Sequence, residues 1–235
     1  MKLELISNRI NEAAFIGHSN SIRRNIVLMV ARNGQGYLQQ GLVAVNLFTY
    51  LYFAEALIDP LNPNWADRDR IFLSTAHNSA VFHATHAERG FLEPSRLETY
   101  MKDGSELEIN VSERLGLVVE ATCGSLSQAL SVATGVAQSA MRQKSAFRNY
   151  VILGDGELQE EQVWEAAMYA ASKQLDNLCL MGDLNHLQVE GHTKNVISME
   201  PIDKKISSLR PDGKSYRWPR FQRDTRNIRI CKINL

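Results

Sequence analysis

The first third of the chain combines two amphipathic segments with one short apolar run. Residues 8–33 carry apolar side chains at helical spacing until a stretch with two glycines interrupts the pattern, and residues 42–57 predict a second helix. A loop rich in proline and asparagine follows, and the apolar run within residues 70–75 predicts a short buried strand. His77 therefore comes just after the carboxyl end of this strand.

The middle of the chain is less regular. Residues 79–89 predict a short helix, whereas residues 104–125 have little periodicity and are expected to form an irregular surface segment that leads to a functional site. Residues 125–141 combine small side chains with helical spacing and predict a tightly packed helix, capped at its start by Ser125 or Ser127.

A strand, a turn, a helix and a second strand occupy the next segment. The strands are expected at residues 150–153 and 177–182, and the helix from about residue 160 to 173. The turn after the first strand is Gly154-Asp155-Gly156. The helix is expected to bury one stripe of side chains, made of Trp164, Ala167, Met168, Ala171 and Leu175.

This order of elements places two polar residues at one edge of a sheet. A strand, helix and strand form a right-handed crossover, which makes the two strands parallel and adjacent or nearly so. Asp155 follows the first strand and Asn185 the second, so both side chains are expected at the carboxyl ends of the strands. Open α/β sheets bind their ligands at that edge.

The donor atoms at this edge favour a hard divalent cation. A carboxylate, an amide oxygen and a nearby backbone carbonyl such as that of Leu187 suit Mg²⁺ but are too few to complete its coordination, so water and phosphate oxygens would supply the rest. Gly156 leaves room for a phosphate near the start of the following helix, whose dipole favours negative charge. The sequence thus predicts a magnesium diphosphate site. The alternative is that Gly-Asp-Gly is only a tight turn and Asp-Leu-Asn only a strand exit.

Composition and charge narrow the class of protein. The chain has 235 residues, 44% of them hydrophobic and 22% charged, as in ordinary globular proteins. The net charge of zero hides a basic segment, because residues 201–235 contain ten Lys and Arg but only three Asp. The three widely spaced cysteines predict a reducing compartment, the cytoplasm, and no segment predicts a secretion signal or a membrane span. A nucleotide-dependent oxidoreductase is disfavoured because neither GxGxxG nor GxxxxGK[ST] follows a strand.

The same segments carry a family resemblance. Residues 154–191, GDGELQEEQVWEAAMYAASKQLDNLCLMGDLNHLQVEG, resemble the thiamine-diphosphate motif of transketolases, in particular of the amino-terminal subunit of split transketolases. DPLNPNWADRDRIFLSTAHNS at residues 59–79 and VVEATCGSLSQALSVATG at residues 118–135 are similar to two further transketolase segments, as is VISMEP at residues 196–201. The resemblance covers roughly residues 20 to 202.

The resemblance implies a fold and a set of site residues. The fold is the α/β thiamine-diphosphate-binding fold, a mostly parallel sheet flanked by helices on both faces, expected over residues 1–202 and incomplete at its carboxyl end. Asp155, Asn185 and the Leu187 carbonyl would bind Mg²⁺. The residues implied to bind the cofactor are His77, Gly124, Ser125, Leu126, Gly154, Gly156, Glu157 and Asn185. Those implied to serve catalysis are His77 with Glu160 and Glu165, two acids that the family places at its subunit interface. A glutamate cluster at the start of a helix also suits the helix dipole, so a structural role for these acids is equally consistent with the sequence.

The resemblance also implies an activity and a partner. Transketolases use thiamine diphosphate to transfer a two-carbon ketol unit between sugar phosphates. The pyrimidine-binding domain that completes such a site has no counterpart in this chain, so a separate pyrimidine-domain subunit is expected, with self-association into a dimer or heterotetramer. No membrane or nucleic-acid partner is expected, and residues 203–235 are expected to form a basic, atypical tail.

Several positions depart from the family pattern. Gln35 and Asn110 stand where two site histidines are expected, and neutral amides cannot carry protons near neutral pH. Four other substitutions add side chains where the family has glycine: Ala76, Ser127, Ala129 and Glu161. They support a second hypothesis, that the chain is a non-catalytic transketolase-like binding or assembly protein.

Overall fold

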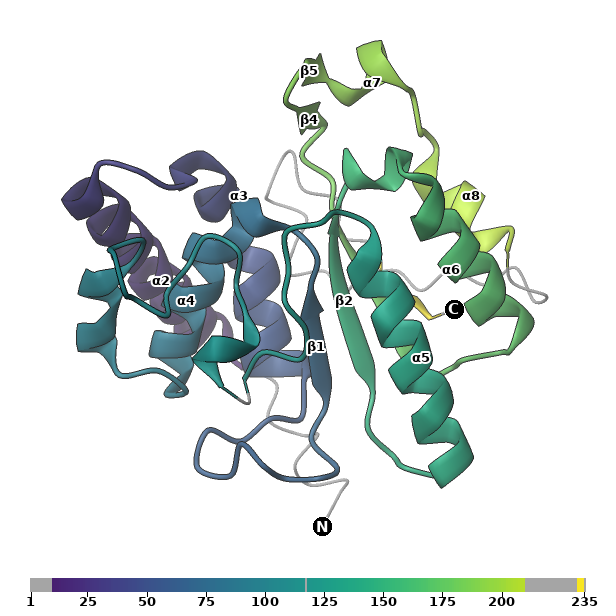
Figure 1. Ribbon diagram of the computed structural model, residues 1–235, viewed down its shortest axis with the longest axis horizontal. Coiled ribbons are helices and arrows are strands. Elements are labelled where there is room, and N and C mark those ends of the chain that lie inside the picture. Colours follow the sequence, from purple (N-terminus) through teal and green to yellow (C-terminus); the bar gives the residue numbers. More distant parts are fainter. Residues whose placement is uncertain (1–9, 117, 210–231, 235) are drawn as a thin grey trace. The chain divides into compact units, whose positions relative to one another are not determined.

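The computed structural model describes residues 10–116, 118–209 and 232–234 (Figure 1). The chain divides into two compact units. The first comprises residues up to 69 together with 76–124, and the second comprises residues 70–75 together with those from 125 onwards.

The first unit is a group of packed helices. Its main elements are α2 (Glu12–Asn33), α3 (Leu38–Tyr50), which continues into a π-helical turn at Leu51–Glu55, and α4 (Ser79–Arg89). The expected helices at the start of the chain and at residues 79–89 are confirmed. The second helix begins four residues earlier than expected, because Gly34 with φ 67° and Gly36 with φ 123° confine the break to a short turn.

The helices of the first unit bury apolar faces against one another. Ile22, Ile26 and Met29 of α2 are buried, as are Leu47 and Phe48 of α3. Gly41 allows close approach, since a Cβ there would lie 3.4 Å from Cγ2 of Ile26 and 3.5 Å from the Cβ of Ala80. The irregular segment expected at residues 104–125 contains only a 3₁₀ turn at Glu113–Leu115 among its described residues.

The second unit contains a mostly parallel sheet. Its strand order is β1 (Arg70–Leu73), β2 (Asn149–Gly154), β3 (Leu178–Asp183) and β6 (Lys232–Asn234). The first three strands are parallel, with Leu73 opposite Ile152 and Gly154 opposite Asp183, whereas β6 pairs antiparallel with β3. The expected crossover is confirmed, and the continuous burial of β2 and β3 is typical of central parallel strands.

Two longer helices accompany this sheet, α5 (Gln128–Gln143) and α6 (Glu161–Ser172), and they lie side by side in Figure 1. The remaining elements follow β3: the hairpin of β4 (Leu187–Gln188) and β5 (Gly191–His192), then the short helices α7 (Thr193–Val196) and α8 (Ile202–Ser207). In Figure 1 the hairpin lies at the top of the view, above β2.

Two expectations about these helices are wrong in detail. Met168 is 52% exposed, because α6 buries Val163, Ala166 and Ala170, and position 168 points away from that stripe. Ser127 occupies the capping position of α5, but its side chain makes no capping hydrogen bond and its φ is 73°. In that left-handed conformation its hydroxyl does not adopt the geometry that a capping serine uses.

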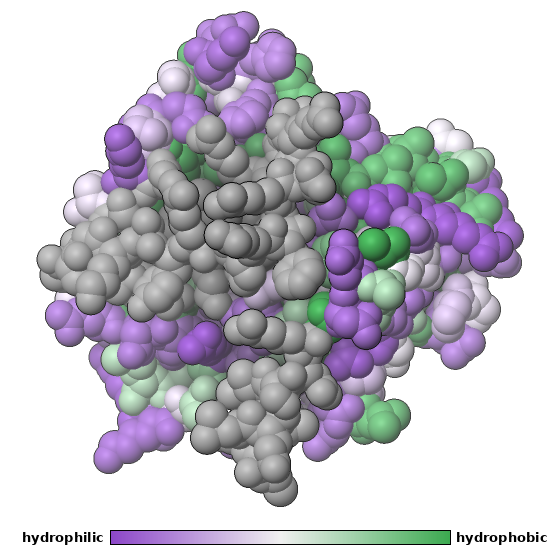
Figure 2. All heavy atoms as spheres, turned by 180° about the vertical axis from the view of Figure 1, so that it is seen from behind, coloured by the Kyte–Doolittle hydropathy of each residue, from purple (hydrophilic) through white to green (hydrophobic). Residues whose placement is uncertain are grey.

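The surface mixes hydrophilic and hydrophobic side chains. On the face seen in Figure 2, hydrophobic residues form small groups among hydrophilic ones. Within the described ranges no helix is both long enough and apolar enough to cross a lipid bilayer. The expected basic tail lies largely outside the described residues, and the division at residue 202 stays a prediction.

Candidate functional site

The site begins where β2 and β3 end. Gly154 is the last residue of β2 and pairs with Asp183, the last residue of β3. One residue further on, the Asp155 amide donates to the Asp183 carbonyl oxygen at 3.3 Å. The two chain segments therefore leave the sheet together, which brings the turn after β2 close to the loop after β3.

The Asp155 carboxylate joins these two segments. Asp155 is 2% exposed, and its Oδ2 accepts a hydrogen bond of 2.6 Å from the backbone amide of His186, the residue after Asn185. Its Oδ1 accepts a bond of 3.0 Å from the amide of Gly156. Burial raises the pKa of the Asp155 carboxyl above its ordinary value, while these backbone hydrogen bonds oppose the shift.

The loop after β3 folds back on this turn. Oδ1 of Asn185 accepts a hydrogen bond of 2.9 Å from the amide of Leu187, and His186 between them has φ 62°. A Cβ added to Gly156 would lie 3.2 Å from the Cβ of Gln188 and 4.0 Å from the carbonyl oxygen of Leu187. A glycine at position 156 therefore lets the loop approach the turn closely.

These donor atoms fit the chemistry of a hard divalent cation. The set contains one carboxylate, one amide oxygen and one backbone carbonyl. The Asp155 and Asn185 oxygens each keep a lone pair beyond the hydrogen bond that they accept. In the part of the chain that the structure describes, no three His, Cys, Asp or Glu side chains cluster so as to hold a metal ion. An oxygen-rich set with open positions suits Mg²⁺ with water and phosphate better than it suits a transition metal.

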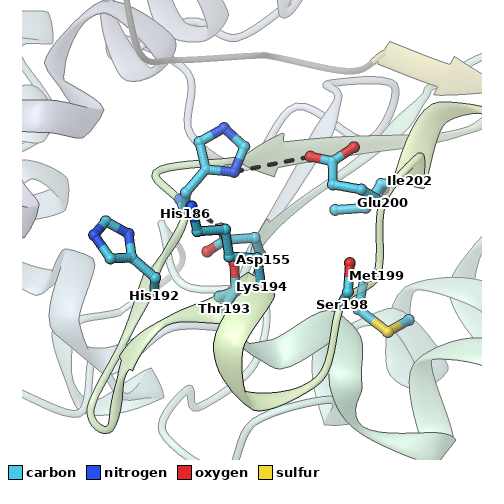
Figure 3. A pocket seen from close by; sticks show the side chains of 9 residues that line it. All are labelled: Asp155, His186, His192, Thr193, Lys194, Ser198, Met199, Glu200 and Ile202. Atoms are coloured by element: carbon cyan, nitrogen blue, oxygen red, sulfur yellow. Dashed lines mark hydrogen bonds and ion pairs between the residues drawn. The ribbon is translucent and has the colours of Figure 1, made fainter.

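A cavity of about 570 Å³ opens beside Asp155 (Figure 3). Its lining includes His186, His192 and Lys194. Nδ1 of His186 lies 3.8 Å from Oε1 of Glu200, which also lines the cavity. Sequence reasoning did not single out these three basic residues. The sequence does contain a signal for them, because all three follow the predicted metal ligand Asn185 within nine residues.

Glu157 is a second buried acid at the turn after β2. It is 2% exposed, and its carboxylate accepts hydrogen bonds from Ser74 Oγ, from the Ser127 amide at 2.6 Å and from the Gly154 amide at 3.2 Å. Burial raises the pKa of Glu157, and these three hydrogen bonds oppose the shift. Both oxygens are therefore used by groups of the protein itself.

The remaining predicted residues of the second unit lie at the surface. Ser125 and Leu126 are exposed and lead directly into Ser127, whose amide binds Glu157. Glu160 is exposed at the capping position of α6, and Glu165 is exposed in the second turn of that helix. The exposure of both acids is compatible with the interface role that the sequence suggested.

His77 and Gly124 belong to the first unit. The His77 ring is half-buried and makes an edge contact with the Tyr37 ring, with centroids 6.2 Å apart, and burial lowers the pKa of this imidazole. Gly124 has φ 126°, and a Cβ there would lie 2.7 Å from Oδ1 of Asn110. Both amides that replace expected histidines, Gln35 and Asn110, are exposed.

Comparison with known proteins places these features in a family. Residues 17–210 match the family of the transketolase thiamine-diphosphate-binding domain. The 6-deoxy-6-sulfo-D-fructose transketolase subunit SqwG of Clostridium sp. (strain MSTE9) is 34% identical over 187 residues, which cover 80% of this chain and 68% of that subunit. An apulose-4-phosphate transketolase subunit of Actinobacillus succinogenes is 36% identical over 188 residues, with the same two coverages.

Solved structures agree with the sequence relatives. The transketolase of Campylobacter jejuni superimposes with a TM-score of 0.79 at 25% sequence identity, over 85% of this chain. The chain spans about a third of the length of that transketolase, 32%. The expectations of an α/β fold and of a transketolase-type protein are thereby confirmed. The chain belongs to the transketolase family and contains its thiamine-diphosphate-binding domain.

Proposed function

We propose that this chain is the cofactor-binding subunit of a split transketolase. In this proposal it binds thiamine diphosphate and Mg²⁺ and works with a separate pyrimidine-domain subunit to move a two-carbon ketol unit between sugar phosphates. The names of two relatives as transketolase subunits support a separate partner. The observation that carries the metal site is the hydrogen bond from the His186 amide to Asp155, which holds the loop with Asn185 and Leu187 against the Gly-Asp-Gly turn.

The site residues of the second unit then have defined tasks. Asp155, Asn185 and the Leu187 carbonyl would hold Mg²⁺, and we assign Gly154 and Gly156 to contacts with the diphosphate. His186, His192 and Lys194 provide hydrogen-bond donors in the adjoining cavity, which suits an anionic ligand. When bound, thiamine diphosphate supplies the carbanion-stabilising chemistry that transfer of a two-carbon unit needs.

Residues outside this turn would contribute to binding and assembly. We assign His77, Gly124, Ser125 and Leu126 to cofactor contacts; the lowered pKa of His77 makes it a neutral donor at pH 7. Glu160 and Glu165 would meet another subunit, where acids of this family help to link cofactor sites. We also place the protein in the cytoplasm, since the three cysteines of the sequence are odd in number and widely spaced and match no disulfide framework.

A binding experiment tests the metal site. Thiamine diphosphate with Mg²⁺ at about 100 times its Kd should stabilise the wild-type protein by about 2.7 kcal/mol, which for a chain of this size is a rise in Tm of about 5 to 10 °C. Asp155→Asn keeps the shape of the side chain but removes the charge, so the metal-dependent rise in Tm should disappear while the circular dichroism spectrum stays native. An unchanged rise in the variant would refute the role of Asp155.

A second function is supported by Gln35 and Asn110. Both amides are exposed and can donate hydrogen bonds to a sugar, but neither can carry a proton as histidine does. If they mark a loss of turnover, the protein would bind the cofactor as a non-catalytic binding or assembly protein. Co-expression with the pyrimidine-domain subunit, followed by an assay of two-carbon transfer, separates these functions. Cofactor binding without transfer would favour the second.

A further inference from the structure

Glu157 connects three segments that are far apart in the sequence. Its Oε1 accepts from Ser74 Oγ and from the Ser127 amide at 2.6 Å, and its Oε2 accepts from the Gly154 amide at 3.2 Å. Ser74 directly follows β1, Gly154 ends β2 and Ser127 directly precedes α5. One buried carboxylate therefore holds together the ends of two strands and the start of a helix.

Two of these contacts adjoin proposed ligand-binding residues. Gly154 directly precedes Asp155, so the bond from its amide sets where the Gly-Asp-Gly turn leaves β2. Ser127 directly follows the exposed Ser125 and Leu126, and its φ of 73° is a conformation that L side chains seldom adopt. The bond from its amide to Glu157 holds the backbone in that conformation.

A direct contact between Glu157 and a ligand conflicts with this geometry. The residue is 2% exposed, its carboxylate accepts three hydrogen bonds from the protein, and, unlike Asp155, it does not line the cavity. A carboxylate so enclosed affects a ligand through the backbone that it holds. The same relation is general around metal sites, where groups behind the ligands orient them and their loss weakens binding.

We propose that Glu157 is a positioning residue that holds the Asp155 turn and the Ser125–Ser127 loop at the spacing required by a metal-bound diphosphate. This inference rests on the proposed function, because it concerns the affinity of that same site. It goes beyond the proposed function because the group that raises the affinity is buried and touches neither metal nor cofactor.

The test replaces the carboxylate with an amide of the same shape. In Glu157→Gln the retained oxygen can still accept from Ser127, but the new amide group faces the Gly154 amide, so one hydrogen bond becomes a contact between two donors. We expect the affinity for Mg²⁺ at saturating thiamine diphosphate to fall about 10- to 100-fold, as measured by calorimetry. Asp176→Asn is the matched control, since it makes the same change at an exposed residue in the turn before β3 and should leave the affinity unchanged.

A second measurement needs no cofactor. Amide hydrogen exchange, followed residue by residue by NMR, should accelerate at Gly154 and at Ser127 in Glu157→Gln, although 27 residues separate them in the sequence. If this variant does not fold, Ser74→Ala removes only the hydroxyl donor and should produce smaller changes in the same direction.

The outcomes separate the two proposals. Wild-type protein that fails to bind thiamine diphosphate and Mg²⁺ contradicts the proposed function. Wild-type protein that binds, with a Glu157→Gln variant of equal affinity, overturns the positioning role alone. Faster exchange at Gly154 and Ser127 without loss of affinity also overturns it, because Glu157 would then stabilise the fold without orienting the site.

Discussion

Acid should destabilise this protein through two buried histidines of α4. His83 is 0% exposed and His86 is 2% exposed. Nε2 of His83 lies 3.0 Å from the Glu108 carbonyl oxygen, and Nδ1 of His86 lies 2.8 Å from the Phe82 carbonyl oxygen. Burial lowers the pKa of His83 to about 4 and that of His86 to about 3, and the carbonyl hydrogen bonds only partly oppose these shifts.

The magnitude follows from linkage between protonation and folding. The unfolded chain binds a proton on each imidazole as the pH falls below about 6.5, whereas the folded chain does so only near pH 4 and pH 3. Stability is therefore lost as the pH falls from about 6.5 towards these values. Between pH 8 and pH 5 each histidine should cost about 2 kcal/mol. About 4 kcal/mol for the pair is a large part of the stability of an ordinary domain.

Urea unfolding between pH 5 and pH 8 measures this loss. The nearby charges are Arg96, which lowers the pKa of His83, and Glu108, which raises it. His83→Gln keeps a donor for the Glu108 carbonyl, and His86→Phe places a ring among Phe82, Tyr52 and Phe91. Each variant should recover about half of the acid loss, and the double variant nearly all of it. If the double variant shows the same pH dependence as the wild type, the reasoning is wrong.

Two further substitutions test the geometry around the site. Ser127→Gly relieves a left-handed conformation at φ 73°. Urea unfolding at pH 8 should therefore show a free energy of unfolding that is higher by about 0.5 to 1 kcal/mol. A lower free energy of unfolding would show that the serine hydroxyl stabilises the loop. Gly156→Ala would place a Cβ 3.2 Å from the Cβ of Gln188, so it should cost about 1 kcal/mol of stability and weaken calorimetric Mg²⁺ binding with thiamine diphosphate. Unchanged binding in this variant would contradict the proposed close approach of the hairpin.

Much of the second unit could be predicted because its signals are local. Continuous apolar runs predicted β2 and β3, and helical spacing predicted α6 between them. The fixed hand of the crossover then brought the turn with Asp155 to the same sheet edge as the loop with Asn185. The hydrogen bond between the His186 amide and Asp155 agrees with this prediction.

Predictions that depended on neighbours were less successful. Met168 was expected in the core, but α6 buries Val163, Ala166 and Ala170, and position 168 points away from them. The sequence also did not predict the burial of His83 and His86. Histidines in a helix of eleven residues are as consistent with an exposed face as with a buried one, and only the neighbouring elements decide which face is covered.

The sequence by itself determined the order of the elements, the strand ends that carry Asp155 and Asn185, and the oxygen chemistry available there, because periodicity, turn residues and crossover hand are properties of short segments. Only the tertiary structure decided which groups those oxygens meet. The enclosure of Glu157 requires Ser74 and Ser127, which lie 83 and 30 residues away in the chain. Contacts at such separations depend on how the whole unit packs, and no local pattern encodes them.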